Sequence, residues 1–485
     1  MIKKILLGLG IVLLLLLAAA VAIPFFFKDE ILAKVKASTN ESLRATVDFK
    51  DVDLSLFRHF PRLSVGLTNL TVVGKEQFEG VQLLGCERFD VAVDLMSALF
   101  GDEIKVKSVF LDKPDLRIFV LPDGTANYDI TKPAATTAPA TAFKATLDRY
   151  EINDGHLRYE DRGLQMVADL DHLNHSGRGE FTQDIYDLVM TTKANALTVD
   201  YGGTRYLLKA KTDWDATLNM DMTHMKFTFK QNSLKINDLD VNLDGWVALP
   251  NDDDIDMDIK FSAPSNSFKD FLSLIPGAYT KDFAGVQASG QVRLAGFAKG
   301  IYNEKRYPAF ALDFGIGNGN FKYPSLPMGI SGIDVDCKIK SPGSDLNAMT
   351  VDIPKFSLKV GANPIAGHFF LKTPMTDPDV DLQLKGILNL ADFSKAYPLD
   401  GVKTLAGLVN ADVFIKAKQS QIEAKSYENM NMGGSFKLDN LKYEAAGTPP
   451  IVINSAAANI SPGRVDLPEF DAIVSDLRMP DMDGA

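Results

Sequence analysis

The feature that most constrains this chain is a strict alternation of apolar and charged residues. In residues 255–261, the odd positions hold Ile, Met, Ile and Phe, while the even positions hold Asp, Asp and Lys. The same pattern recurs in residues 238–244, 334–340 and 379–385. A period of two places apolar side chains on one face of a strand and charged side chains on the other. We therefore predict a mainly β fold of antiparallel strands, each with one apolar and one polar face.

Two kinds of interruption break this alternation. The apolar phase is even at Met220 and odd at Phe227, which predicts a β-bulge near His224. Helical spacing appears in residues 268–275, before Pro276, and in residues 390–396, before Pro398.

The N-terminus is strongly apolar. Two lysines precede an uncharged run over residues 5–27, which is long enough to span a bilayer as a helix. We expect a single uncleaved membrane anchor, with the amino terminus inside and the bulk of the chain exported. A cleaved signal peptide, with the A-x-A sequence at 20–22 as its cleavage site, is the alternative. The lysines after the span leave the orientation undecided by charge.

Composition excludes several classes of protein. The formal net charge is −12 and no Lys/Arg block is present, which weighs against nucleic-acid binding. Cys86 and Cys337 are the only cysteines, so neither a disulfide scaffold nor a cysteine zinc site is expected.

The sequence predicts five segments. Residues 131–142, rich in Pro, Ala and Thr, form a predicted linker. The predicted segments are an anchor (1–27), an N-terminal β unit with a leading helix (28–130), the linker (131–142), a repetitive β-groove region (143–460) and a tail (461–485).

Degenerate repeats support an extended β structure. Residues 152–159 (INDGHLRY) match residues 316–323 (IGNGNFKY), and residues 438–443 are a weaker copy. The two helical segments also correspond, because a strand that starts with glycine follows each of them, at 290–294 and at 407–411. Repetition of this kind favours a structure built by adding similar units.

Four motifs, in order, carry a resemblance to a known family. They are residues 47–57 after the anchor and its short helix, residues 60–74 (FPRLSV followed by LTVVG), residues 104–118, and the turn DGTANY at 123–128. Together they resemble the AsmA family of bacterial envelope proteins, in its Bacteroidetes type, over about residues 1–460. The resemblance implies a bacterial inner-membrane protein with a periplasmic body, related to TamB-like proteins whose β-groove is thought to carry phospholipid. It also implies a link to outer-membrane assembly. With this resemblance we predict an N-terminal transmembrane helix followed by an elongated antiparallel β-groove of repeating β units with a few short helices.

The apolar phase supplies the surface such a protein needs. An acyl chain costs about 0.8 kcal/mol per CH₂ to expose to water, so a sixteen-carbon tail faces ~13 kcal/mol. We predict that phospholipid acyl chains contact a groove lined by Phe227, Phe229, Leu239, Val241, Leu243, Ile255, Met257, Ile259, Phe261, Val335, Ile339, Val380, Leu382 and Leu384. Packing of the same positions in a β-sandwich, as a scaffold for outer-membrane protein assembly without lipid, is the alternative.

No motif predicts catalysis, a cofactor or a metal. His172 and His175 lack an evident third ligand, and the Asp runs at 252–254 and 377–381 lack the Gly and Glu of a calcium loop. The glycines in 315–319 are interpreted as a turn. Cys337 is interpreted as a core or groove-lining residue and not a nucleophile, and Trp214 and Trp246 as packing residues. G-x-S-x-G, H-E-x-x-H and P-loop sequences are absent, so the chain is expected to be non-enzymatic. A clustered acid pair in a closed pocket would favour the other alternative, an envelope-bound enzyme.

The last residues carry a second, short resemblance. Residues 470–484 resemble the phosphoacceptor strand and loop of a response-regulator receiver domain, with Asp476 in the acceptor position. An upstream acidic pair is missing, and the sequence given stops before the threonine and lysine that the chemistry requires. We interpret this stretch as a fragment without phosphotransfer activity.

Overall fold

A computed structural model describes residues 36 to 474, apart from 37–39, 42, 56, 61, 95, 98–104, 133–144, 252, 273, 275–285, 304, 325 and 398. The predicted membrane span, most of the linker and Asp476 lie outside the described residues. Among those that are described, no helix is both long and apolar enough to cross a membrane. The chain divides within β10 into two compact units, residues 1–223 with 230–235 and residues 224–229 with 236–485. Each is treated by itself.

The prediction of a mainly β fold is confirmed, because the described residues form 22 strands and few helices. Those of the first unit are β1 (Ala45–Asp48), β2 (Asp51–Ser55), β3 (Leu63–Gly74), β4 (Gln82–Val93), β5 (Val106–Val120), β6 (Ala145–Asp161), β7 (Met166–Arg178), β8 (Ile185–Tyr201) and β9 (Thr204–Asp221), with the 3₁₀ helix η1 (Glu76–Phe78). β10 (Lys226–Ile236) contributes residues to both units.

The first five strands enclose a packed core. β1 and β2 both pair with β3, and β3, β4 and β5 continue the antiparallel order. Buried apolar side chains from β1, β3 and β4 meet there, among them Val47, Val72 and Cys86, together with Phe49 from the link between β1 and β2. Their burial removes apolar surface from water and stabilises this part of the unit.

The predicted DGTANY turn closes that core. Asn127 is 3% exposed; its Nδ2 donates to the Arg117 carbonyl at 2.7 Å, and its Oδ1 accepts from the Phe119 amide at 2.9 Å. The side chain thus fastens the turn against β5. Ile130, two residues after the turn, packs on the core.

One pairing departs from the predicted antiparallel order. β5 and β6 pair in parallel, with Leu111 opposite Ile152. Parallel neighbours require a crossover longer than a hairpin turn, and residues 121–144 supply it. The strands on either side of the predicted linker are therefore hydrogen-bonded to each other, and β6 to β9 then continue antiparallel.

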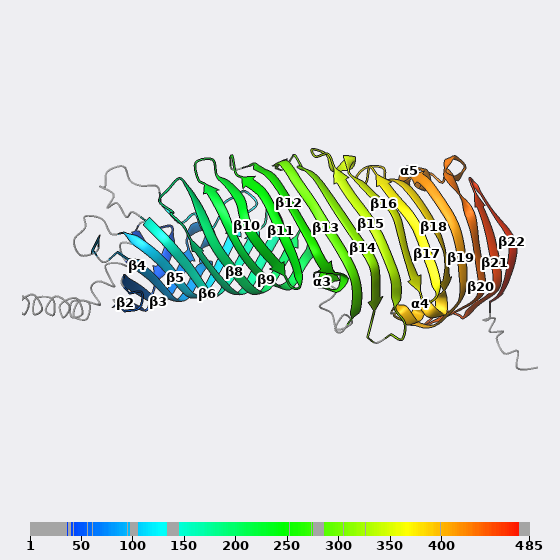
Figure 1. Ribbon diagram of the computed structural model, residues 1–485, viewed down its shortest axis with the longest axis horizontal. Coiled ribbons are helices and arrows are strands. Elements are labelled where there is room, and N and C mark those ends of the chain that lie inside the picture. Colours follow the sequence, from blue (N-terminus) through cyan, green and yellow to red (C-terminus); the bar gives the residue numbers. More distant parts are fainter. Residues whose placement is uncertain are drawn as a thin grey trace, which may run out of the picture. The chain divides into compact units, whose positions relative to one another are not determined.

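The second unit holds β11 (Leu239–Ala248), β12 (Ile255–Ser267), β13 (Gln287–Tyr302), β14 (Ala309–Lys322), β15 (Ile330–Ser341), β16 (Thr350–Val360), β17 (Asn363–Lys372), β18 (Asp379–Asn389), β19 (Val402–Lys418), β20 (Asn431–Ala445), β21 (Ile451–Ser461) and β22 (Arg464–Val474). Each strand pairs antiparallel with the next in the chain. Figure 1 shows these strands side by side in chain order.

Both predicted helical interruptions are confirmed. They are α3 (Phe268–Leu272) and α4 (Leu390–Ala396), which lie at the same end of the strands (Figure 1). The Asn389 side chain accepts from the Ala391 and Asp392 amides and so caps α4. The short helices α5 (Gln419–Glu423), η3 (Leu346–Ala348) and η4 (Tyr427–Asn429) lie in connections.

Two local interpretations were wrong. The phase change near His224 is a turn over residues 222–225 between β9 and β10, not a bulge within one strand. Conversely, residues 315–319 form no turn but lie inside β14, where the register shifts between Ile316 and Gly319. A bulge adds one residue to a strand and shifts its phase without reversing the chain.

The sequence repeat corresponds to a recurring left-handed residue. Asp154, Asn318 and Asn440, at matched positions of the three copies, have φ of 50°, 50° and 54°. In the second unit each copy faces a glycine with positive φ. Gly290 lies against Gly319, and Gly407 lies against Leu441, where a Cβ atom would come within 2.7 and 2.9 Å of the facing Cα atoms. The repeat thus marks a position where the backbones of two neighbouring strands approach closely.

Candidate functional site

Apolar side chains of the second unit line up across neighbouring strands. Residues in direct register share a face of the sheet, so the pairings define rows. One row crosses nine strands, β11 to β19: Leu243, Phe261, Gly296, Leu312, Ile339, Val351, Leu371, Val380 and Ala417. We call the face that carries this row and the two described next the apolar face.

Two further rows run beside the first. The shorter one holds Ile353, Phe369, Leu382, Ile415 and Met432. The longer one holds Val292, Ile316, Val335, Phe356, Gly367, Leu384, Val413, Gly434, Ile460 and Val465, on β13 to β22. The apolar phase that each strand shows in sequence is therefore in register from strand to strand.

The predicted lining residues fall on this arrangement as follows. Leu243, Phe261, Ile339 and Val380 lie in the first row, Leu382 in the second, and Val335 and Leu384 in the third. The other predicted residues lie on the same strands or on β10. Leu239 and Val241 have the same phase as Leu243 on β11, and Ile255, Met257 and Ile259 have the same phase as Phe261 on β12. Phe227 and Phe229 lie on β10. All are half-buried except Leu239, which is 1% exposed.

Part of the apolar face is covered. Phe268 and Leu272 of α3 are buried with Val292, and Phe314, Ile316 and Ile333 pack around them. The helix thus closes the face at one end of β13 to β15. Away from that end, Ile339 and Leu382 remain half-buried.

An apolar hollow of about 410 Å³ lies over β18 to β22. Leu382, Ile415, Met432, Phe436 and Ile460 are among the residues that line it. Its lining includes residues of the second and third rows, so the hollow lies on the apolar face.

The opposite face carries a ladder of ion pairs. Lys299 Nζ lies 2.7 Å from Asp258, Lys385 Nζ lies 2.6 Å from Asp412, and Arg293 Nη2 lies 2.7 Å from Asp336. The hydrogen bond to Asp258 raises the pKa of Lys299, and the hydrogen bond to Asp336 raises the pKa of Arg293. Exposed pairs of this kind contribute little stability, and they keep this face polar and solvated.

The histidines considered as metal ligands are not brought together. His172 Nδ1 lies 2.6 Å from Asp154, in an exposed pair. His175 instead contacts the Tyr150 hydroxyl at 2.9 Å and the Thr192 hydroxyl at 2.8 Å, and burial lowers its pKa.

The structure gathers a different set, His156, Asp169 and Asp171, whose ligand atoms lie within 4.8 Å of one another. Sequence reasoning missed it because His156 is on β6 and both carboxylates are on β7. The alternation of Asp169 and Asp171 on one strand was the available signal.

The remaining singled-out residues have local roles. Asp254 accepts from Asn251 and Asn303, and Asp377 accepts from Ser420. Trp214 packs in the cluster around Leu188, and Lys226 lies 4.1 Å above the Trp246 ring. Cys337 is half-buried opposite Phe314, and burial raises the pKa of its thiol.

The receiver-like stretch finds no support. Its described residues, up to Val474, belong to β22 and pair antiparallel with β21, for example Phe470 with Ala456. They extend the same sheet. A receiver domain is an α/β fold in which this strand would sit in a parallel sheet.

Comparison with known proteins gives one result. The family model described as the AsmA family matches residues 1–273. Searches of curated proteins and of solved structures found no match.

Proposed function

Because the chain belongs to the AsmA family, we propose that it is an inner-membrane-anchored periplasmic protein that binds phospholipid and conducts it along its apolar face. In this proposal residues 5–27 anchor the chain, and the protein serves outer-membrane biogenesis without enzymatic activity. Outer-membrane or other envelope proteins are its proposed partners.

The observation that carries the proposal is the register of the apolar rows. A row that crosses β11 to β19 without a charged residue offers continuous contact to an acyl chain. Contact of this kind offsets the cost of exposing each CH₂ group to water, about 0.8 kcal/mol. The ion pairs on the opposite face keep that face solvated, so one face of the sheet suits acyl chains and the other suits water.

The alternative is a β-sandwich scaffold for outer-membrane protein assembly that binds no lipid and whose apolar face packs against another sheet. Half-burial of Ile339 and Leu382 favours the lipid proposal, because the core of a sandwich buries such side chains fully.

Lipid retention distinguishes the two. Residues 28–474, without the apolar span, would be expressed in a bacterial periplasm and purified without detergent, and bound lipid would be extracted and identified by mass spectrometry. Leu382→Asp places a charge in the second row and in the hollow, while Gln383→Asp places the same charge on the exposed neighbouring position.

We expect stoichiometric phospholipid on the wild type and on Gln383→Asp, and loss of most of it from Leu382→Asp with an unchanged circular dichroism spectrum. A folded wild type without lipid would contradict the proposal. Unfolding of Leu382→Asp alone would show instead that this position is a packed core, as in the scaffold alternative.

A further inference from the structure

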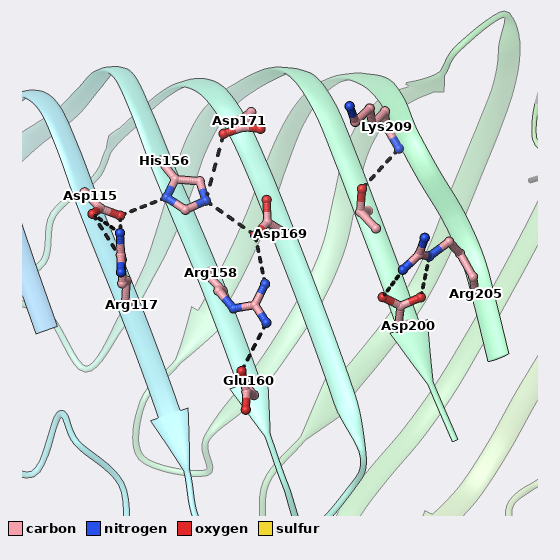
Figure 2. A network of polar contacts seen from close by, with 11 residues as sticks. Asp115, Arg117, His156, Arg158, Glu160, Asp169, Asp171, Asp200, Arg205 and Lys209 are labelled. Atoms are coloured by element: carbon pink, nitrogen blue, oxygen red, sulfur yellow. Dashed lines mark hydrogen bonds and ion pairs between the residues drawn. The ribbon is translucent and has the colours of Figure 1, made fainter. Parts of the chain in front are cut away.

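His156 lies between carboxylates of two neighbouring strands on the polar side of the first unit (Figure 2). Its Nδ1 atom is 2.8 Å from Asp115 Oδ1 on β5. Its Nε2 atom is 3.4 Å from Asp169 Oδ2 and 3.9 Å from Asp171 Oδ1, both on β7. The imidazole is therefore held on one side and faces two oxygens on the other.

The local backbone sets this position. The register between β6 and β7 shifts on either side of Gly155, and Asp154 just before it has a positive φ. Asp169 and Asp171 are two apart on β7 and point to the same face (Figure 2). Arg158 is directly opposite Asp169, and in the same antiparallel order His156, two residues earlier on β6, comes level with Asp171 at the edge of the register shift.

The distances on the two sides of the ring differ in kind. The 2.8 Å separation at Nδ1 is a charge-assisted hydrogen bond, in which Nδ1 donates to Asp115. The separations of 3.4 and 3.9 Å at Nε2 are long for hydrogen bonds. Two ligands at about 2.0–2.1 Å from a tetrahedral Zn²⁺ lie about 3.3 Å apart, close to the Nε2–Asp169 distance.

Asp115 acts as the partner that a metal-bound histidine normally has. It is itself fixed by Arg117, whose Nη2 lies 2.8 Å away, and by Gln82 at 3.2 Å. A carboxylate on Nδ1 fixes the tautomer that leaves Nε2 with a lone pair for an ion. This support comes from β4 and β5, outside the strands that carry the three ligand atoms.

The neighbouring arginine leaves both carboxylates usable. Arg158 donates to Asp169 Oδ2 at 3.3 Å and to Glu160 at 3.1 Å, so its charge is shared between two acids. Asp171 is 54% exposed and needs only a small rotation to bring an oxygen closer to Nε2. A cation can therefore approach from solvent.

We propose that His156, Asp169 and Asp171 bind a divalent transition-metal ion, with Zn²⁺ as the preferred ion, and that the bound ion ties β6 to β7. One imidazole with two carboxylates suits Zn²⁺ better than Mg²⁺ or Ca²⁺, which prefer oxygen ligands alone. Three protein ligands leave a fourth position for water. This inference is independent of lipid binding.

The test is Zn²⁺ binding to the detergent-solubilised full chain, measured by isothermal titration calorimetry. Burial by itself would lower the pKa of His156. The hydrogen bonds to the carboxylates of Asp115 and Asp169 more than offset this effect, so the pKa of His156 is raised. Since a proton competes with the metal ion for the His156 imidazole, the calorimetric titration is run at about pH 8.

Three variants define the site. His156→Ala removes the nitrogen ligand, and Asp171→Asn removes one carboxylate while leaving the Asp115–Arg117 and Asp169–Arg158 contacts in place. His172→Ala is the matched control, because His172 is an exposed histidine on β7 that contacts the single carboxylate of Asp154 at 2.6 Å.

We expect one Zn²⁺ per chain, at least tenfold weaker binding in His156→Ala and in Asp171→Asn, and unchanged binding in His172→Ala. Zn²⁺ should also raise the melting temperature of the wild type but not of Asp171→Asn, because an ion bound only by the folded state stabilises it. Co²⁺ in place of Zn²⁺ should give visible absorption bands of a low-symmetry site that His156→Ala lacks.

Two results would overturn the proposal. One is Zn²⁺ binding of equal strength in the wild type and in Asp171→Asn. The other is a loss of binding in His172→Ala as large as in His156→Ala, which would indicate ordinary surface histidine binding.

Discussion

The strands β1 to β5 and the strands of the second unit alternate apolar and polar residues alike, yet they bury them differently. In β1 to β5, Ala45 is 0% and Phe49 is 2% exposed, within a cluster that side chains of β3 and β4 and Ile130 complete. In the second unit, Ile339, Leu382 and Ile415 on the apolar face are only half-buried. One pattern thus serves a closed core in one region and a one-sided apolar face in the other.

Polar groups differ in the same way. Asp90 on β4 is 3% exposed and is bound by Arg88 through contacts of 2.7 and 2.8 Å. Asp336 on β15 is 56% exposed and forms a solvent-exposed ion pair with Arg293. The comparison teaches that alternation reports which face is apolar but not what covers it, and that burial must come from the rest of the fold.

Phe49→Ala should have the largest effect on stability. Removing a buried phenylalanine side chain costs about 3–5 kcal/mol, because it loses transfer free energy and leaves a cavity. Ile415→Ala, at a half-buried position, should cost about 1 kcal/mol, since much of that side chain is already in contact with solvent. Urea unfolding followed by circular dichroism measures both. Equal losses would show that the apolar face is as closed as the core.

Arg88→Ala should cost somewhat less, about 3 kcal/mol, because it leaves the buried carboxylate of Asp90 without its main partner. Arg58, 3.6 Å from Asp90, compensates for part of the charge. Arg293→Ala should change stability by about 0–1 kcal/mol, since its pairs are exposed. The same unfolding assay compares them, and a loss in Arg293→Ala as large as in Arg88→Ala would remove the proposed contrast.

The two cysteines provide a smaller effect that needs no substitution. Burial raises the pKa of both thiols, so both should react slowly with iodoacetamide. Cys86 is 5% exposed in the packed core, whereas Cys337 is half-buried on the apolar face. Peptide mass spectrometry over time should show modification of Cys337 at least tenfold faster than of Cys86, and added phospholipid should slow it. Equal rates, or no protection by lipid, would count against an open face.

Much of the fold is predictable because its signals are local. The alternation around Val335 and Leu382 predicts strands, and the apolar spacing before Pro276 and Pro398 predicts α3 and α4. The errors arose where one local signal fits two structures. A change of phase at His224 suits a bulge or a turn, and the glycines near Asn318 suit a turn or a bulge. The parallel pairing of β5 with β6 depends on a long crossover and has no short-range signal.

The candidate sites differ in predictability for the same reason. The phase of Ile339 and Leu382 along their own strands names the apolar positions, but their alignment in rows depends on the register between strands. The contact of His156 with Asp169 and Asp171 depends wholly on that register, because the residues lie on different strands. Neither property is encoded within one strand.

The most direct test of the account is photo-crosslinking of the full chain in bacterial cells that express it. A photoreactive phenylalanine analogue would replace Ile415, on the apolar face, or Lys416, its neighbour on the polar face, and adducts would be identified by mass spectrometry. We predict phospholipid adducts at position 415 and none at position 416. Protein adducts without lipid at 415, or lipid at both positions alike, would contradict a lipid-binding apolar face.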